Sequence, residues 1–224
     1  MKRHALSTRL WHWLNAAAVI VLFMSGLNIS NAHRYLYWGD YGYDPADAWM
    51  KVVRFPGWAT LPQYYNLAAA RDWHILAAWP FALGLLFMWA TMLANGHFHR
   101  DLATRASDWT PGALLASLRR RGGTSPMSPR SYNPAQRILY GVMLGVVLPL
   151  LVFTGLAISP GLEPAAPWLV ELLGGRQSAR SLHFIAAWAL AGFAVIHLAL
   201  ALVQWRLIGA MISGGRRQEG EADG

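Results

Sequence analysis

Four long apolar segments dominate the chain and restrict what it can fold into. Each can cross the hydrocarbon core of a membrane, which is about 30 Å thick and takes roughly 20 apolar residues of helix. Of the 224 residues, 55% are hydrophobic and only 13% are charged, a composition that excludes an ordinary soluble domain. We therefore expect an all-α protein, a single domain over residues 1–224 built as a four-helix transmembrane bundle. The predicted spans are residues 10–29, 73–94, 136–158 and 182–205.

The first segment also fits a cleaved signal peptide, because it follows the basic start MKRHALSTR and ends near Ala32. A retained helix is the preferred interpretation. The apolar run is long for a signal peptide, and LWHWLN places two tryptophans and a histidine at its start, where an aromatic membrane anchor is expected.

The charges give the orientation. With the N-terminus in the cytoplasm, the cytoplasmic segments carry thirteen cations against five acids, whereas the outer loops carry six of each. The whole net charge of +8 then lies on the cytoplasmic side, as the positive-inside rule requires, and both termini are cytoplasmic. Contact with membrane lipid accounts for the basic residues, so no nucleic-acid partner is expected. The tail 213–224 is expected to be disordered, and no internal repeat stands out.

The first outer loop, residues 30–72, is too long for a simple connector and is rich in tryptophan and tyrosine. We expect short helices or turns at the membrane surface that form a lid or a docking surface. Trp38, Trp49 and Trp58 would contribute to docking. An aromatic belt without a partner is an equal alternative.

The chain contains no cysteine, which excludes disulfides, thiolate iron–sulfur clusters and covalent c-type haem. Four histidines lie in or beside the predicted spans, where a polar ring is costly without a partner. His12 lies near the cytoplasmic side, and His74 and His183 lie near the outer side. His197 follows His183 by fourteen residues, about 21 Å further in and about 40° from the same helix face. The four sort into an inner pair, His12 with His197, and an outer pair, His74 with His183.

Two pairs of imidazoles at two depths suit two iron porphyrins, because an apolar macrocycle needs helices around it and nitrogen ligands for its metal. Four unrelated histidines bonded to carbonyls or water are the alternative. Arg9, Arg71 and Arg180 each precede a histidine by three residues and could bind porphyrin propionates, or extend as interfacial charges. Six glycines could let macrocycles approach the helices: Gly26, Gly84, Gly141, Gly145, Gly155 and Gly192.

Three motifs resemble the bacterial di-haem cytochrome b subunits (cytochrome b561-like) of nickel hydrogenases and formate dehydrogenases. They are RLWHWLNA with His12, RDWH with His74, and RSLHF with His197 fourteen residues after its histidine. The resemblance covers nearly the whole chain. It implies a multi-pass protein of the bacterial inner membrane with two b-type haems, whose irons are bound axially by His12 with His197 and by His74 with His183.

The resemblance also implies a quinone site on the cytoplasmic side, next to the inner haem. The segment SYNPAQR resembles the family's segment that lines this pocket, with Asn133 and Gln136 at its polar positions. Ala135 departs from the glycine expected in formate dehydrogenase subunits. A simple turn and helix cap is the alternative interpretation of YNP.

The stretches FPGWATLP and GGRQSARSLHF resemble a subgroup paired with periplasmic molybdopterin oxidoreductases. The expected function is therefore electron transfer between quinone and a periplasmic redox partner, by a subunit with no catalytic residue of its own. One alternative is a stand-alone superoxide:quinone oxidoreductase. A histidine-lined transporter is a poorer fit, because proton or ion relays usually need carboxylates inside the helices.

Overall fold

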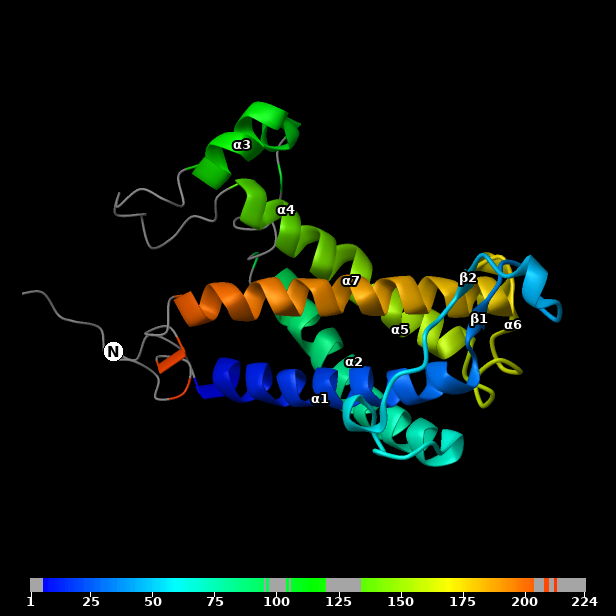
Figure 1. Ribbon diagram of the computed structural model, residues 1–224. Helices are drawn as coiled ribbons and strands as arrows, with labels where there is room; N and C mark the ends of the chain where they lie inside the picture. Colours follow the sequence, from blue (N-terminus) through cyan, green and yellow to red (C-terminus); the bar gives the residue numbers. More distant parts are fainter. Residues whose placement is uncertain are drawn as a thin grey trace, which may run out of the picture. The chain divides into compact units, whose positions relative to one another are not determined.

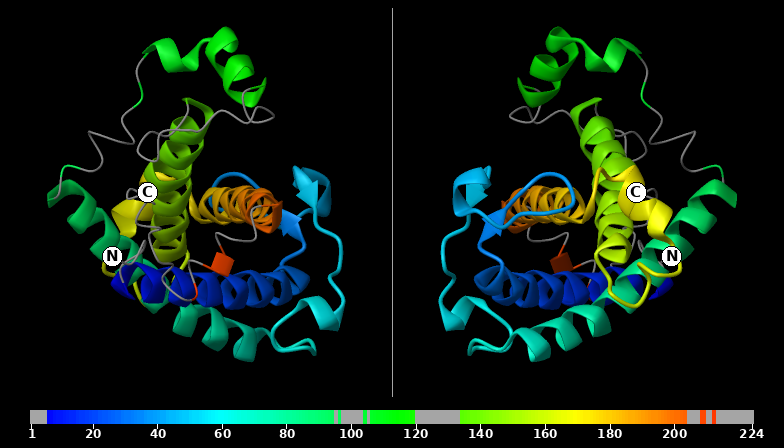
Figure 2. Two further views of the ribbon diagram at one scale, coloured as in Figure 1. Left: turned by 90° about the vertical axis from the view of Figure 1, so that its left-hand side faces the viewer. Right: turned by 90° about the vertical axis from the view of Figure 1, so that its right-hand side faces the viewer.

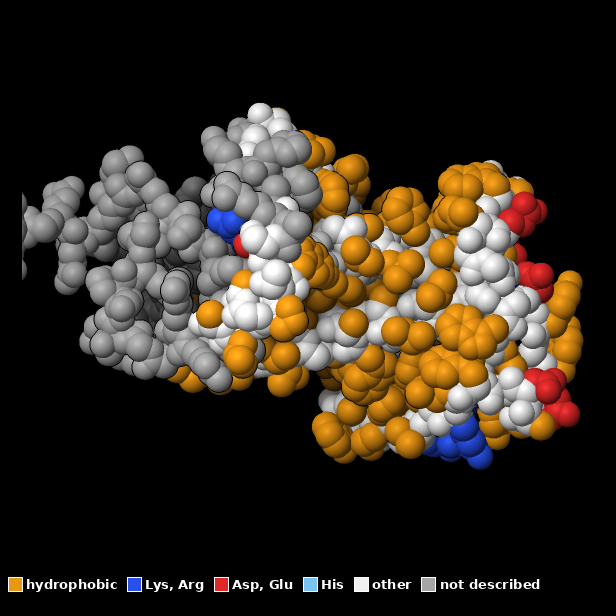
Figure 3. Space-filling view, turned by 90° about the horizontal axis from the view of Figure 1, so that it is seen from above, with side chains coloured by type: hydrophobic (Ala, Val, Ile, Leu, Met, Phe, Trp, Pro, Cys, Tyr) orange, Lys and Arg blue, Asp and Glu red, His pale blue; other side chains and the backbone are white. Residues whose placement is uncertain are grey.

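The computed structural model contains four helices long and apolar enough to cross a membrane, which confirms the predicted architecture. The structure describes residues 6–94, 96, 104, 106–119, 134–203, 208–209 and 212. The spans lie in α1 (Leu6–Ala32), α2 (Leu67–Ala94), the run α4–η6–α5 (Pro134–Val142, Met143–Val147, Leu148–Ala157) and α7 (Arg176–Val203), shown in Figure 1. On the face drawn in Figure 3, hydrophobic side chains predominate along the helices, as contact with lipid requires.

The second and fourth helices begin six residues before the predicted apolar runs. Polar groups that precede an apolar run can accept hydrogen bonds from the first backbone amides of a helix. The helix can therefore begin before the apolar residues by which hydropathy locates the span. At the start of α2, the side chain of Asn66 accepts a hydrogen bond of 3.0 Å from the amide of Ala69. At the start of α7, the carbonyl of Gly39 accepts from the amides of Gln177 and Ser178.

The chain divides into two compact units. Unit 1 comprises Met1–Tyr37, Gly42–Gly84 and Ala191–Gly224, and unit 2 comprises Trp38–Tyr41 and Leu85–Leu190. The unit boundaries fall inside α2 and α7, so both helices contribute to both units. The single membrane domain over residues 1–224 stays a prediction.

In unit 1, the loop after α1 contains a short antiparallel strand pair, β1 (Tyr35–Leu36) with β2 (Met50–Lys51). Two short 3-10 helices, η1 (Pro45–Asp47) and η2 (Gly57–Ala59), form further turns. Figure 1 shows this loop at the C-terminal end of α1. The expected short helices are present, whereas the strand pair was not predicted, because two residues are too few to show alternation.

Hydrogen bonds tie this loop to α1. Asn28 is fully buried and donates from Nδ2 to the carbonyls of Pro62 at 2.8 Å and Tyr64 at 2.9 Å. About one turn later, Asn31 donates to the carbonyl of Phe55 at 3.0 Å and accepts from the Phe55 amide at 2.8 Å. The two amide side chains satisfy loop backbone that would be costly to bury unpaired. They make α1 and the loop one folded assembly.

In unit 2, α4, η6 and α5 follow one another without a break, and Figure 2 shows them as one continuous helix. The η6 segment is π-helical, and Pro149 follows it in the first turn of α5. Proline lacks an amide hydrogen and cannot bond to the carbonyl one turn back, so a widened turn before it avoids part of that loss. Two shorter elements, η4 (Ala106–Trp109) and α3 (Pro111–Arg119), precede this helix.

The core of unit 2 lies where α5, α6 (Pro167–Leu172) and the start of α7 meet. Ala157, Leu169 and Ala179 are buried there. The two alanines allow close approach of the helices that carry them. Arg176 forms an ion pair with Glu163 and donates to a backbone carbonyl at the end of α5 at 3.2 Å. The first turn of α7 is therefore fixed against α5.

Gly175 forms the turn before α7 with a φ of +103°, and a Cβ there would lie 2.4 Å from the carbonyl carbon of Gly39. We expect Gly175→Ala to lower the midpoint of thermal unfolding in detergent. A left-handed conformation costs a non-glycine residue about 1–2 kcal/mol, to which the clash adds. Gly161→Ala is the matched control, because a Cβ there meets nothing within 4 Å. Equal midpoints for the two variants would contradict this account of the turn.

Candidate functional site

His12 of α1 and His197 of α7 lie together in unit 1. Their imidazole centroids are 6.3 Å apart, and the ring planes are inclined at 48°. Phe193, one turn before His197, stacks on its ring at a centroid distance of 5.8 Å, and Trp13 packs edge-on against His12 at 5.3 Å. The predicted inner pair is thus brought together by helices from opposite ends of the sequence.

The imidazole nitrogens of this pair include one that makes no hydrogen bond among the described residues. Nδ1 of His12 is buried and has no hydrogen-bond partner among the described residues, and His197 is exposed on an apolar helix. Within the part of the chain that the structure describes, no three His, Cys, Asp or Glu side chains gather as a site for a bare metal ion. Two imidazoles without a carboxylate or thiolate suit the axial positions of a haem iron, which brings its own four equatorial nitrogens.

His74, in the third turn of α2, contacts α1 within unit 1. Its Nδ1 lies 3.0 Å from Oγ of Ser25, which is fully buried. The next residue, Gly26, leaves room for the ring, since a Cβ there would lie 3.6 Å from Cε1 of His74. The imidazole of His74 therefore rests on one turn of α1.

His183, in the third turn of α7, has the same surroundings within unit 2. Its Nδ1 lies 2.9 Å from Oγ1 of Thr154 on α5, and Thr154 is fully buried. A Cβ added to Gly155 would lie 3.4 Å from Cε1 of His183. In both units a hydroxyl residue bonds the imidazole, and the glycine after it makes space for the ring.

The two surroundings are built from one repeated pattern. Residues 22–30, LFMSGLNIS, and 151–159, LVFTGLAIS, are identical at five of nine positions. Residues 71–79, RDWHILAAW, and 180–188, RSLHFIAAW, are also identical at five of nine. The expectation of no internal repeat is therefore wrong at this scale. The helix pairs α1–α2 and α5–α7 repeat one arrangement, and the alignment of residues 22–30 with residues 151–159 is the signal that could have revealed Ser25 and Thr154.

The structure does not test every predicted site residue. His74 belongs to unit 1 and His183 to unit 2, so the outer pairing stays a prediction. Asn133 lies outside the described residues, as does the side chain of Gln136, although Gln136 belongs to α4. The quinone site they were predicted to form also stays a prediction.

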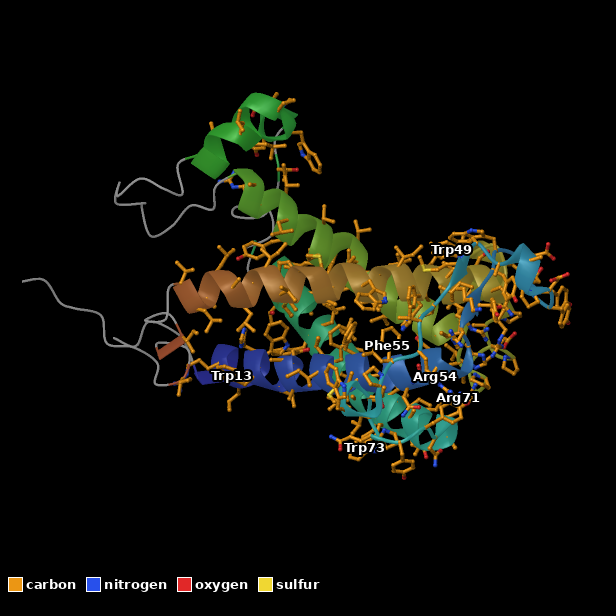
Figure 4. The ribbon with its side chains drawn as sticks, in the orientation of Figure 1. Trp13, Trp49, Arg54, Phe55, Arg71 and Trp73 are labelled. Atoms are coloured by element: carbon orange, nitrogen blue, oxygen red, sulfur yellow. The ribbon has the colours of Figure 1, made fainter. Side chains whose placement is uncertain are left out.

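The three arginines expected beside the propionates each have a protein partner. Arg9 donates to the carbonyl of Ile212, and Arg180 donates to the amide oxygen of the glutamine one turn before it at 2.9 Å. Nη2 of Arg71 lies 3.4 Å from Nε2 of His33. Figure 4 labels Arg71 in the early turns of α2, near the C-terminal end of α1. Their predicted contact with propionates stays untested.

The glycines also differ from one another. Gly84 is already covered, because Nε1 of Trp11 donates to its carbonyl at 2.9 Å and a Cβ would lie 3.0 Å from Nδ2 of Asn15. It serves packing of α1 on α2 within unit 1. At Gly141, Gly145 and Gly192, a Cβ would meet nothing within 4 Å.

Known proteins resemble the chain over nearly its whole length. Residues 3–214 match the family described as prokaryotic cytochrome b561. The chain is 31% identical over 209 residues to the putative protein-methionine-sulfoxide reductase subunit YedZ1 of Azospira oryzae, covering 92% of this chain and 93% of that protein. It is 27% identical over 229 residues to the probable Ni/Fe-hydrogenase B-type cytochrome subunit of Cupriavidus necator, covering 93% and 83%. No solved structure gives a significant match.

The His74 ring lies against Gly26, so the effect of a substitution at Gly26 on haem content should increase with the size of the new side chain. Gly26→Ala should keep the haem content, because its Cβ would be in ordinary contact with the ring at 3.6 Å. Gly26→Val adds two methyl groups to that contact and should lower the haem content by displacing His74. Haem per protein, measured as the pyridine haemochrome, checks both variants. Full haem in Gly26→Val would show that the ring does not depend on this space.

Proposed function

Because the chain belongs to the prokaryotic cytochrome b561 family, we propose that it transfers electrons across the membrane through two b-type haems, between the quinone pool and a periplasmic redox partner. Family membership and the four apolar helices identify a multi-pass membrane protein with b-type haem, whose iron accepts and donates one electron. The observation that carries the proposal is the close approach of His12 and His197 from two helices. These two imidazoles are the proposed axial ligands of the inner haem.

His74 and His183 are the proposed ligands of the outer haem. Both lie eight residues into their helices and occupy the same position in the repeated R-x-x-H-x-x-A-A-W pattern. Each also has a hydroxyl group on Nδ1, and Nε2 is the proposed ligand atom for the iron. The two axial positions of a haem iron are equivalent. Two histidines in matching surroundings, one from each of the two similar helix pairs, suit these positions.

Arg9, Arg71 and Arg180 are proposed to bind the haem propionates. Each lies one turn from a proposed ligand, at one of the two ends of the spans, and a guanidinium group can bind a carboxylate with two parallel hydrogen bonds. Arg71 contacts an imidazole and Arg180 contacts a neutral amide, and a carboxylate is a stronger partner for a cation than either group.

The proposed partner is a periplasmic oxidoreductase of the molybdopterin type, with the protein in the bacterial inner membrane. Two relatives are named as subunits of a methionine sulfoxide reductase and of a hydrogenase, which supports a redox partner protein. Trp38, Trp49 and Trp58 are exposed, as an aromatic docking surface requires. The acids Asp40, Asp44 and Asp47 in the same loop would favour a basic partner surface.

Two other functions are separable from this one by measurement. Superoxide-dependent quinone reduction by the purified chain alone would favour a stand-alone superoxide:quinone oxidoreductase. A visible spectrum of the purified protein without haem bands would favour a transporter, although carboxylates are absent from the described parts of the four spans except for Asp72, near the start of α2.

The quinone site is proposed to lie beside the inner haem, with Asn133 and Gln136 as hydrogen-bonding groups. Replacing both by leucine should slow haem reduction by quinol while both haems are kept, because the pocket would lose its polar contacts with the quinone oxygens. Stopped-flow reduction of the haem absorbance measures the rate. Gln63→Leu is the control, an exposed amide in the loop on the other predicted side. Equal rates for the two variants would remove Asn133 and Gln136 from the site.

Haem counts in paired substitutions test the ligand assignment. His74→Ala with His183→Ala should retain about one haem, as either single substitution should, because both residues act on one unit. His74→Ala with His197→Ala should retain no haem. Pairing His12 with His183 instead would require one macrocycle to bridge about 20 Å along the helix axes.

The count is made on purified protein by haemochrome, with circular dichroism to check that the helices are intact. A variant that lacks both His74 and His183 but keeps two haems would falsify the assignment. So would one haem remaining when His74 and His197 are both replaced.

A further inference from the structure

We infer that Ser25 and Thr154 are positioning residues that hold His74 and His183 in the tautomer with hydrogen on Nδ1 and thereby lower the reduction potential of the outer haem. The inference rests on the proposed function, since it takes these two histidines as ligands of one haem. It adds two residues that neither the predicted ligand set nor the proposed function contains.

In unit 1, the contacts of the Ser25 hydroxyl favour acceptance of a hydrogen bond from the imidazole. Its one hydrogen is directed to the carbonyl of Val21 at 2.7 Å, with the carbonyl of Leu22 at 3.1 Å. An Oγ atom that donates along its own helix has only lone pairs to offer to Nδ1 of His74 at 3.0 Å. This contact requires the hydrogen on Nδ1.

In unit 2, Thr154 repeats this arrangement. Its hydroxyl donates to the carbonyl of Leu150 at 2.5 Å, with the carbonyl of Leu151 at 3.3 Å, and lies 2.9 Å from Nδ1 of His183. With the hydroxyl hydrogen on the helix carbonyl, the imidazole supplies the hydrogen of the contact between the side chains. Each hydroxyl is 0% exposed, so water does not compete for these bonds.

This tautomer has two consequences at the iron. Nε2 carries the lone pair and is the ligating atom, with the ring held in one orientation. A hydrogen bond from Nδ1–H to an acceptor raises the basicity of the ligand, which stabilises ferric over ferrous haem and lowers the reduction potential. Two such bonds would act on the outer haem, one on each axial ligand.

The inner pair differs in this respect. Nδ1 of His12 is buried without a hydrogen-bond partner among the described residues, and no hydroxyl side chain takes the place that Ser25 has beside His74. The inner haem therefore lacks at least one of the two bonds. The hydroxyl contacts distinguish the two haems, and their removal should affect only one.

The test uses the variant His12→Ala with His197→Ala, which retains the outer haem alone under the proposed function. In this background, Ser25→Ala and Thr154→Val should each shift the midpoint potential upward, and the two together should shift it further. Ser25→Thr and Thr154→Ser keep the hydroxyl and should leave the potential near its starting value. Potentiometric titration of the haem α-band gives each midpoint.

Two controls separate positioning from a general effect on the fold. Ser30→Ala removes a hydroxyl that bonds a carbonyl one turn back in α1, at 2.9 Å from the carbonyl of Gly26, and it should not move the potential. In the complementary background, His74→Ala with His183→Ala, the same Ser25 and Thr154 substitutions should leave the inner haem's potential unchanged. If Ser25→Ala does not retain haem, Ser25→Cys takes its place, because a thiol is a weaker acceptor of similar size and should also raise the potential.

An unchanged potential in all hydroxyl-free variants, with the haem retained, would overturn this inference and leave the ligand pairs in place. So would a shift of the inner haem's potential by the same substitutions. Failure of the proposed function looks different, because the two histidine backgrounds would then not hold one haem each before Ser25 or Thr154 is changed.

Discussion

Hydrocarbon offers no hydrogen bonds, so each polar group on the four helices needs a partner from the protein itself or from a cofactor. The buried amide of Asn28 meets loop carbonyls, and the indole of Trp11 meets a carbonyl of α2. The hydroxyl groups of Ser25 and Thr154 each contact a carbonyl of their own helix and an imidazole of a neighbouring helix. These polar residues therefore mark where helices and loops are joined, while many large apolar side chains of the spans are exposed, as contact with lipid requires.

The same constraint explains why histidine suits the role of the proposed haem ligand. An imidazole can give up one nitrogen to a protein partner and keep the other for a metal, whereas a carboxylate would bring a charge into the span. His74 and His183 show the division, because each has its Nδ1 engaged by a hydroxyl. His12 and His197 rest on aromatic rings and on each other, so their nitrogens are less committed to the protein.

Sequence predicted the parts that depend on composition or on depth along a helix. Hydropathy over about 20 residues located the spans, and the spacing of His12 and His197 from the ends of their helices matched them as a pair. Helix starts could not be located in this way, because one residue such as Asn66 determines where α2 begins. Ser25 and Thr154 were missed because a hydroxyl in a membrane helix usually bonds only the carbonyl one turn back. Whether it also meets an imidazole depends on how neighbouring helices pack.

The π-helical turn η6 affects how the third span must be viewed. One extra residue in a turn rotates everything after it by about 100° relative to an uninterrupted α-helix. The stripe of side chains that α4 presents is therefore not continued by α5, although the two share an axis. A single helical wheel drawn over residues 134–157 would therefore place the side chains of α5 at the wrong angle relative to those of α4. Thr154 lies after this turn, so its angular position on α5 includes the phase introduced at Met143–Val147.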